Sequence, residues 1–322
     1  MRLRLAAAVC AAMLTAGPAL AQGDICPERT IRFMIPFPPG GSTDALARLI
    51  QPRMSELLGR TILVENRGGA AGSIGTAAAA AAPGDGCTVL FVFDTHATNP
   101  TLIPNLPFDT KRDLAPLMLV GTNAMVVTAH RSAAYTDFRQ VIAEGKQPGK
   151  EPAYGSIGNG SLAHLAMTQL QKLGGFSMTH VPYRGGGPAV QDLLGGNIHW
   201  HMATVASSLG HIQGGRLRAL GTTHTARVPT LPEVPTIAES GYPGYTLNEW
   251  NGLYAPAGTP EPALDRLHAA ALHALAQDAV KSRIETLGAL TVGSPRAEFA
   301  RFVSDGRERM AQLVAEAKIS ID

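Results

Sequence analysis

Short apolar runs alternate with longer segments of helical periodicity along most of the chain. Residues 31–35 form an apolar run that predicts a buried strand, and apolar side chains recur three and four positions apart in 43–58, which predicts an amphipathic helix. Pro52 lies inside that second segment, so we expect a kink there or two shorter helices. The same criteria predict further strands at 61–65, 88–93, 117–128, 153–156, 178–182, 198–204, 217–222 and 250–255, and further helices at 73–82, 136–145, 161–173, 187–194, 262–276, 278–287 and 295–317. This alternation favours an α/β fold in which largely parallel sheets are flanked by helices.

The first 21 residues have the pattern of a secretory leader. Arg2 and Arg4 precede the apolar stretch 5–16, which is too short to span a bilayer, and residues 19–21 form an A-x-A cleavage motif. We therefore expect cleavage after Ala21 and a protein that works in the periplasm.

The charge balance argues against a nucleic-acid-binding surface. The chain has 27 Lys and Arg against 25 Asp and Glu, and the two excess positive charges, Arg2 and Arg4, both lie in the predicted leader. The remaining chain is formally neutral and lacks the basic field that nucleic-acid recognition needs. Its roughly 300 residues are enough for two lobes.

Two cysteines remain after the leader, and each precedes a predicted strand. Cys26 lies just before 31–35, and Cys87 lies just before 88–93. If these strands are parallel neighbours, both cysteines lie at the same edge of the sheet, and a disulfide is feasible in an oxidising compartment. The alternative is two unpaired cysteines, which is less usual in a secreted protein.

Four glycine-rich turns connect predicted strands to predicted helices, at 38–44, 68–75, 156–165 and 182–190. Glycine permits positive φ and close backbone approach, so that N–H groups can converge on an oxyanion beside the positive end of a helix. One such turn is ordinary loop chemistry. Four of them, with Arg184 in the last, favour an anion-binding cleft.

Other motifs give little support to a cofactor or a metal. Residues 158–163 fit the pattern G-x-G-x-x-A, but no acid stands about 20 residues further on to bind a ribose, so the match to a dinucleotide site is weak. His199 and His201 alternate in a predicted strand and would face one side, yet no Cys, Asp or Glu stands at a spacing that completes a metal site. We interpret both histidines as structural or cleft-lining, and we expect no cofactor and no metal.

Two further polar residues allow two interpretations each. Asp44 would either contact a ligand through water or stabilise the N-terminus of its helix. His96 would either line the cleft or pack in the core. The sequence does not decide between these roles.

With these segments assembled, the chain resembles the Bug/TctC family of periplasmic solute receptors, which serve tripartite tricarboxylate transporters. The resemblance rests on the segments 36–48 (PFPPGGSTDALAR), 64–75, 99–109, 155–165, 180–196, 231–245 and 250–260 (WNGLYAPAGTP). It implies the two-lobed type II periplasmic-binding-protein fold, with a mostly parallel sheet flanked by helices in each lobe and crossover strands between the lobes. We expect residues 22–121 and 226–322 to form lobe 1 and residues 122–225 to form lobe 2.

The resemblance also implies a function without catalysis. The protein would reversibly bind a small organic mono- or dicarboxylate between its lobes and deliver it to the membrane subunits of the transporter, as a monomer that binds no nucleic acid. The expected ligand-binding residues are Pro39, Gly40, Gly41, Ser42, Asp44, His96, Asn159, Gly160, Ser161, Arg184, Gly185, His201 and Thr204. The alternatives are a ligand sensor in a signalling pathway and, with less support, a secreted hydrolase.

One segment departs from the family pattern after the glycines at 195–196. The family often has acids near positions 199 and 203, where this chain has His199 and Ala203. An acid there could hold an ammonium group, so its absence favours a simple carboxylate over an amino acid as the ligand. Asp94 and His96 are also unusual, because the family tends to have small and hydroxyl residues in that segment.

Overall fold

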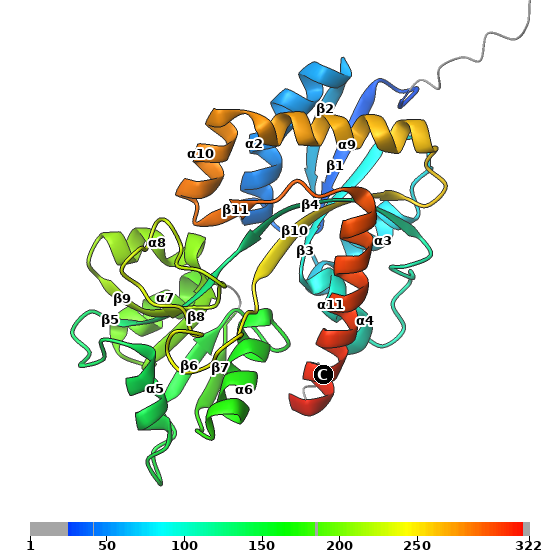
Figure 1. The fold of residues 1–322 in the computed structure, drawn as a ribbon. Coiled ribbons are helices and arrows are strands. Elements are labelled where there is room, and N and C mark those ends of the chain that lie inside the picture. Colours follow the sequence, from blue (N-terminus) through cyan, green and yellow to red (C-terminus); the bar gives the residue numbers. More distant parts are fainter. Residues whose placement is uncertain (1–24, 41, 184–185, 318–322) are drawn as a thin grey trace, which may run out of the picture.

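The computed structural model describes residues 25–40, 42–183 and 186–317. They form two lobes, and each lobe is built on one sheet flanked by helices (Figure 1). Gly41, Arg184 and Gly185, which the sequence places in the site, lie outside the described residues, as does the predicted leader.

The sheet of lobe 1 has the order β11-β4-β10-β3-β1-β2. Its strands are β1 (Thr30–Ile35), β2 (Thr61–Asn66), β3 (Thr88–Phe93), β4 (Leu114–Asn123), β10 (Glu249–Pro256) and β11 (Ala289–Thr291). The helices of this lobe are η1 (Ala70–Gly72), α2 (Ser42–Leu58), α3 (Ser73–Ala80), α4 (Thr95–Leu102), α9 (Glu261–Ala276), α10 (Asp278–Thr286) and α11 (Arg296–Ala317). Strands β2, β1, β3 and β4 share one direction, whereas β10 and β11 run antiparallel to their neighbours.

The sheet of lobe 2 has the order β7-β6-β8-β5-β9. Its strands are β5 (Met125–His130), β6 (Ala153–Ser156), β7 (Thr179–Pro182), β8 (Trp200–Thr204) and β9 (Leu217–Thr222), and its helices are α5 (Phe138–Gly145), α6 (Leu162–Gly174), α7 (Gly186–Gly195) and α8 (Val205–Gln213). Strand β5, which arrives from lobe 1, runs antiparallel to both of its neighbours. In this sheet β5 occupies the position that β10, the strand returning from lobe 2, occupies in the lobe 1 sheet: each is the fourth strand counted from the edge formed by β7 or β2.

Helix α2 shows how the apolar pattern becomes a packed element. Leu46, Ile50 and Met54 are buried against the apolar strands of the lobe 1 sheet, as the spacing in the sequence predicts. Of the two expectations for Pro52, two shorter helices is wrong, because one continuous helix runs through this residue. Ile50 and Met54 are fully buried on either side of Pro52, and this packing offsets the hydrogen bond that proline removes.

The chain crosses between the lobes at two places. The first crossing is at Ala124, which divides the predicted strand 117–128 into β4 and β5. The second comes later than the expected boundary at 226, because the segment after β9 still packs on lobe 2. There Ile237 N donates to Thr222 O at 2.7 Å, and Tyr245 Oη donates to the carbonyl of Ala166 at 3.1 Å. The return to lobe 1 therefore lies just before β10.

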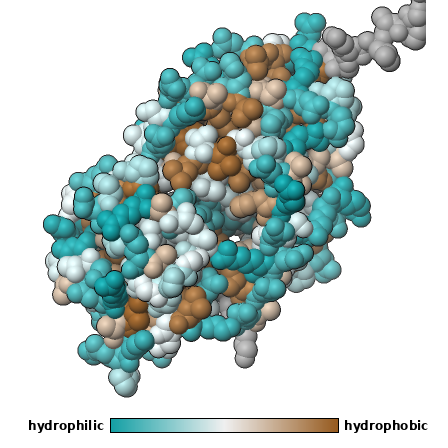
Figure 2. Space-filling model, viewed as in Figure 1, coloured by the Kyte–Doolittle hydropathy of each residue, from teal (hydrophilic) through white to brown (hydrophobic). Residues whose placement is uncertain are grey.

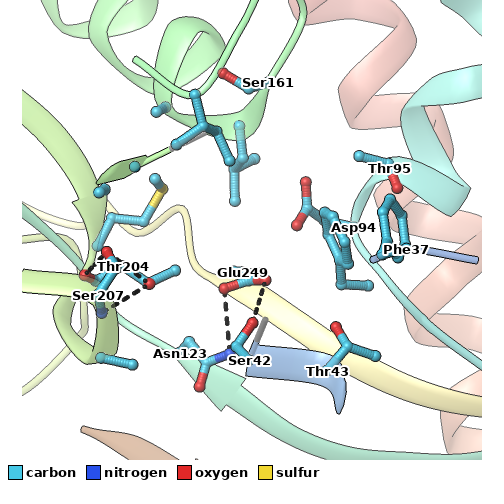
Figure 3. A pocket seen from close by; sticks show the side chains of 18 of the residues that line it. Phe37, Ser42, Thr43, Asp94, Thr95, Asn123, Ser161, Thr204, Ser207 and Glu249 are labelled. Atoms are coloured by element: carbon cyan, nitrogen blue, oxygen red, sulfur yellow. Dashed lines mark hydrogen bonds between the residues drawn. The ribbon is translucent and has the colours of Figure 1, made fainter. Parts of the chain in front are cut away.

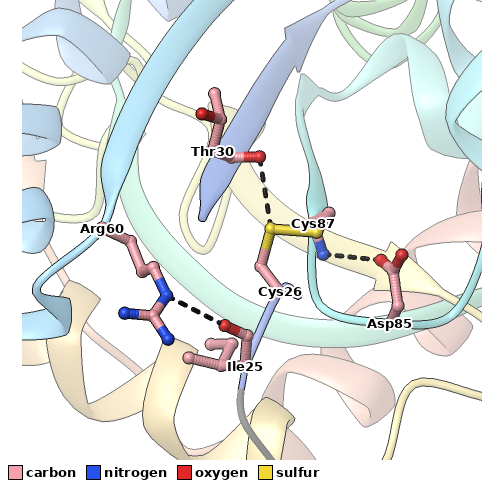
Figure 4. Close-up of a disulfide and its surroundings, with 6 residues drawn as sticks. All are labelled: Ile25, Cys26, Thr30, Arg60, Asp85 and Cys87. Atoms are coloured by element: carbon pink, nitrogen blue, oxygen red, sulfur yellow. Dashed lines mark hydrogen bonds between the residues drawn. A yellow bond between two sulfur atoms is a disulfide. The ribbon is translucent and has the colours of Figure 1, made fainter. Parts of the chain in front are cut away.

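A disulfide joins Cys26 to Cys87, as the positions of the two cysteines before parallel neighbouring strands predict. It links the segment before β1 to the start of β3 (Figure 4). The surrounding chain is fixed by Asp85, whose carboxylate accepts from Cys87 N at 2.8 Å, and by Arg60, which donates to the carbonyl of Ile25.

The outer surface is largely hydrophilic on the face shown in Figure 2, with exposed hydrophobic side chains in patches over lobe 1. Within the described residues, no helix combines the length and the apolar character needed to cross a bilayer. Helix α11 lies against lobe 1 along most of its length and reaches lobe 2 near its end, where Lys172 Nζ on α6 lies 2.7 Å from Glu316 Oε2.

Candidate functional site

A cavity of about 760 Å³ lies between the lobes, with walls from both. It is formed where strands end and helices begin: β1 leads into α2, β3 into α4, β6 into α6 and β8 into α8. The carboxyl ends of strands in open α/β sheets are the usual place for a ligand. Figure 3 shows the polar side chains that point into this space.

Helix N-termini make the cavity chemically suited to an anion. Ser42 and Thr43 begin α2, Thr95 begins α4, Leu162 begins α6 and Ala206 lies in the first turn of α8, and all of these residues line the cavity. The first N–H groups of a helix have no acceptor within the helix, and the helix dipole adds positive potential at the same end. A carboxylate can therefore be bound by main-chain groups alone.

Asp44 fixes the shape of the first glycine-rich turn. Its Oδ2 accepts from Gly40 N at 3.0 Å, Arg48 Nε donates to both carboxylate oxygens, and Asn66 Nδ2 donates to Oδ1 at 3.0 Å. Burial opposes ionisation of this carboxyl, but the hydrogen bonds from Arg48, Gly40 and Asn66 outweigh it and hold the pKa of Asp44 below its ordinary value. Asp44 lies in the cavity wall with its acceptor positions occupied by the protein, which favours the structural role.

Two stacked histidines, His164 and His180, support the turn before α6. Ser161 caps the helix, accepting from His164 N at 3.4 Å and donating to the carbonyl of Gly158 at 2.7 Å. His164 Nδ1 accepts from Gly160 N at 3.2 Å, and its ring stacks on His180 with a centroid distance of 3.8 Å. Burial lowers the pKa of both histidines to about 4, so they remain neutral at neutral pH and keep the turn in place.

Two acids that face the cavity have no cationic partner among the described residues. Glu249 begins β10, and its carboxylate accepts from Asn123 Nδ2 at 3.2 Å and from Ser42 Oγ at 3.4 Å. Burial raises its pKa to about 7, although the hydrogen bonds from Asn123 and Ser42 oppose the rise. Asp94 lies between β3 and α4, and burial followed by the charge of Glu249 raises the pKa of Asp94 well above its ordinary value.

An aromatic pair supplies an apolar part of the wall. The rings of Phe37 and Phe93 lie 4.2 Å apart between centroids and are tilted by 35°. Leu102, Met125 and Ile157 also line the cavity. The site therefore suits a small ligand that has both an anionic end and an apolar part.

The structure brings together most of the described residues that the sequence places in the site. The cavity is lined by Pro39, Gly40, Ser42, Asp44, Asn159, Gly160, Ser161 and Thr204. The third and fourth glycine-rich turns approach each other here, since Gly186 of the fourth also lines the wall. The second turn contributes only Ala71 among its described residues.

His96 and His201 lie elsewhere, contrary to the expectation that they contact ligand. His96 is buried beside Tyr254, with a centroid distance of 4.6 Å, and His201 is fully buried in β8; neither lines the cavity. Burial lowers the pKa of His96 to about 3 and that of His201 to about 4. His199 is exposed instead and accepts from Ala153 N, so it does not share the surroundings of His201.

No group of three or more His, Cys, Asp or Glu side chains in the described residues is arranged to hold a metal ion. The lining residues that the sequence did not assign to the site include Asp94, Glu249, Asn123 and the aromatic pair. For Glu249, the available signal was an acid placed immediately before the apolar strand at 250–255.

The repeated strand order and the interlobe cavity define a two-lobed solute-binding protein of the type II periplasmic class. Comparison with known proteins agrees: residues 46–319 match the tripartite tricarboxylate transporter family receptor. The chain belongs to this family.

A relative matched by sequence and two solved structures illustrate this membership. Protein BugT of Bordetella pertussis is 35% identical over 316 residues, which cover 97% of each chain. The structure of R. palustris Rpa4515 with adipate is 30% identical, with a TM-score of 0.83 over 91% of this chain and 99% of that one. MatC from Rhodopseudomonas palustris with bound malate is 31% identical, with a TM-score of 0.79 over 90% of this chain and 100% of that one.

Proposed function

We propose that this protein is a periplasmic receptor that reversibly binds a small organic carboxylate between its lobes and delivers it to the membrane subunits of a tripartite tricarboxylate transporter. The observation that carries the proposal is the convergence of the N-termini of α2, α4, α6 and α8 on one cavity. The two R. palustris relatives, whose structures contain adipate and malate, support the same ligand class. The leader pattern and the disulfide support a periplasmic location.

Binding in this proposal consists of exchanging hydration for protein contacts. Closure of the lobes brings the turn at 38–44 and the turn at 156–161 onto opposite sides of the ligand. Main-chain N–H groups replace the water around the carboxylate, and Phe37 and Phe93 cover its apolar part. Opening of the lobes reverses each step, so no covalent intermediate is needed.

The proposal assigns no reaction to the site. Ser156 Oγ lies 2.6 Å from His180 Nε2, which is the spacing of a nucleophile and its base. Ser156 is fully buried, however, and does not line the cavity. Its hydroxyl contacts the carbonyl of Gly158 and serves to hold the turn before α6.

A thermal-shift panel of mono- and dicarboxylic acids tests the proposal on the purified protein. At least one acid should raise Tm by several degrees, because a ligand at 100 times its Kd adds about 2.7 kcal/mol to stability. Hydrolysis of an ester panel without any stabilisation by carboxylates would contradict the proposal.

A matched pair of variants locates the binding. Ala206→Phe fills the cavity at the first turn of α8 and should abolish the stabilisation. Ala276→Phe adds the same side chain at an exposed position at the end of α9 and should preserve it.

A further inference from the structure

Among the described residues that line the cavity, the carboxyl groups have no balancing cation. Asp44, Asp94 and Glu249 line the wall, whereas no Lys, Arg or His stands among its described lining residues. Asp44 is paired with Arg48, whose guanidinium approaches from outside the cavity wall. Asp94 and Glu249 therefore face the ligand space without a positive partner from the described chain.

Asp94 lies where an aspartate side chain ordinarily accepts a hydrogen bond from the first turn of a helix. It occupies the N-cap position of α4, yet its side chain makes no capping hydrogen bond. Asp94 is only 4% exposed, and its carboxylate points into the cavity (Figure 3). A buried acid that neither caps its helix nor pairs with a described residue is available to a ligand.

Glu249 points into the same space from the strand that returns from lobe 2. It is 7% exposed, and the hydrogen bonds from Asn123 and Ser42 fix its orientation on the cavity floor (Figure 3). Both of those donors are neutral, so they position the carboxylate without neutralising it. Burial raises the pKa of Asp94, and the charge of Glu249 raises it further, so ionising one acid makes it costlier to ionise the other.

Ionising two buried acids without a cation is costly unless a positively charged partner arrives. A ligand that carries only carboxylates would make ionisation of Asp94 and Glu249 still less favourable. A ligand that also carries a protonated amine would instead form charge-assisted hydrogen bonds with both side chains and remove the cost.

We propose, on the basis of the proposed function, that Asp94 and Glu249 form an ammonium-binding subsite, so that the preferred ligand is an α-amino acid or a similar zwitterion. Its carboxylate is bound by the helix N-termini, and its amine lies between the two acids. This reverses the expectation drawn from Ala203, because the acids that the sequence lacks near 199 and 203 are supplied by other elements of the fold.

Titration calorimetry with matched ligand pairs tests the subsite. A thermal-shift screen of all proteinogenic amino acids and their deaminated forms comes first. Each pair then compares an amino acid with the acid that lacks its amine, such as L-aspartate with succinate, L-glutamate with glutarate, and L-leucine with 4-methylpentanoate. The amino acid of at least one pair should bind at least 10-fold more tightly than its partner.

Amide variants assign the preference to the two acids. Asp94→Asn and Glu249→Gln should each weaken the amino acid about 10- to 100-fold and leave the deaminated acid unchanged or more tightly bound. Glu308→Gln, an exposed acid on α11, is the matched control and should change neither affinity. The melting temperature of each ligand-free variant shows that it is folded.

The outcomes separate this inference from the proposed function. Tight binding of deaminated acids without a preference for the amine would overturn the ammonium subsite but not the carboxylate receptor. Asp94 and Glu249 would then share a proton and donate a hydrogen bond to the ligand. Binding of neither class would overturn both. An amine preference that survives both amide variants would also remove Asp94 and Glu249 from the subsite.

Discussion

Glu249 shows how one buried carboxyl makes stability depend on pH. Burial raises its pKa from 4.5 to about 7 in the folded protein. A carboxyl whose pKa is raised by folding favours the folded state while it is protonated, so its contribution is complete below about pH 4.5 and is lost as the pH rises through about 7. Buried His96, His164 and His201, whose pKa values are lowered, act in the opposite direction below about pH 6.5.

The comparison with Glu249→Gln isolates this contribution. The free energy of unfolding of the ligand-free protein, relative to that of Glu249→Gln, should fall by roughly 3 kcal/mol between pH 4.5 and 8. Urea titrations at a series of pH values measure this difference. The difference between the protein and Glu308→Gln should stay constant, and a constant difference for Glu249→Gln would show that its pKa is not raised.

At the residue scale, local chemistry was predictable and long-range pairing was not. Gly40, Ser42 and Ser161 could be assigned to the cavity from sequence because glycine and hydroxyl residues at a strand-to-helix turn act on their own backbone. Glu249 meets Asn123 only because β10 pairs with β4 in that register, across 126 positions of sequence. No local pattern contains that information.

At the scale of elements, helix α3 is positioned by a close backbone contact. A Cβ added at Gly75 would lie 2.5 Å from the carbonyl oxygen of Arg67 and 2.7 Å from Cα of Pro36. These are main-chain atoms just after the ends of β2 and β1, so they cannot turn aside as a flexible side chain would. Gly75 therefore sets how closely α3 approaches the strand that carries the first turn of the cavity.

Gly75→Ala should lower the free energy of unfolding by about 1–3 kcal/mol, because the helix must move away from β1 to relieve the overlap. The midpoint of urea unfolding measures this change. Gly306→Ala is the matched control, since Gly306 lies within α11 with open space at the position of its Cβ, and it should stabilise by about 0.5–1 kcal/mol. Equal stability of the protein and Gly75→Ala would contradict the steric argument.

The elements that the sequence did not reveal are short. Helix α4 has the sequence THATNPTL, whose polar residues and Pro100 resemble a turn, and α8 contains Ser207, Ser208 and Gly210. Helices of this length gain most of their stability from packing rather than from propensity. The longer elements carry enough apolar periodicity to be predicted, whereas the strand order of the two sheets depends on pairing between distant segments and came only from the structure.

At the scale of the whole molecule, the disulfide fastens the beginning of the chain to the lobe 1 sheet. Cys26 and Cys87 are separated by 61 positions, and their bond lies where β1 and β3 begin, at the opposite strand ends from the cavity. Closing a loop of this size restricts the unfolded chain considerably. The bond should therefore affect stability much more than binding.

Replacing both cysteines with serine should lower the free energy of unfolding by about 4 kcal/mol, within a usual range of about 2–5 kcal/mol. Urea unfolding of the oxidised protein and of the double variant measures the loss, and titration calorimetry with the ligand found in the panel should give the same Kd for both. A large loss of affinity with no loss of stability would show that the disulfide shapes the cavity instead.

The use of main-chain groups at α2, α4, α6 and α8 has an evolutionary consequence. A substitution changes a side chain but leaves N–H groups and helix dipoles in place, so binding of the carboxylate persists through sequence drift. Side chains that line the rest of the wall, including Asp94 and Glu249, are then free to change with little risk to that binding. Proteins with this fold can therefore change their ligand by substituting a few residues of the cavity wall, while the main-chain contacts that bind the carboxylate stay the same.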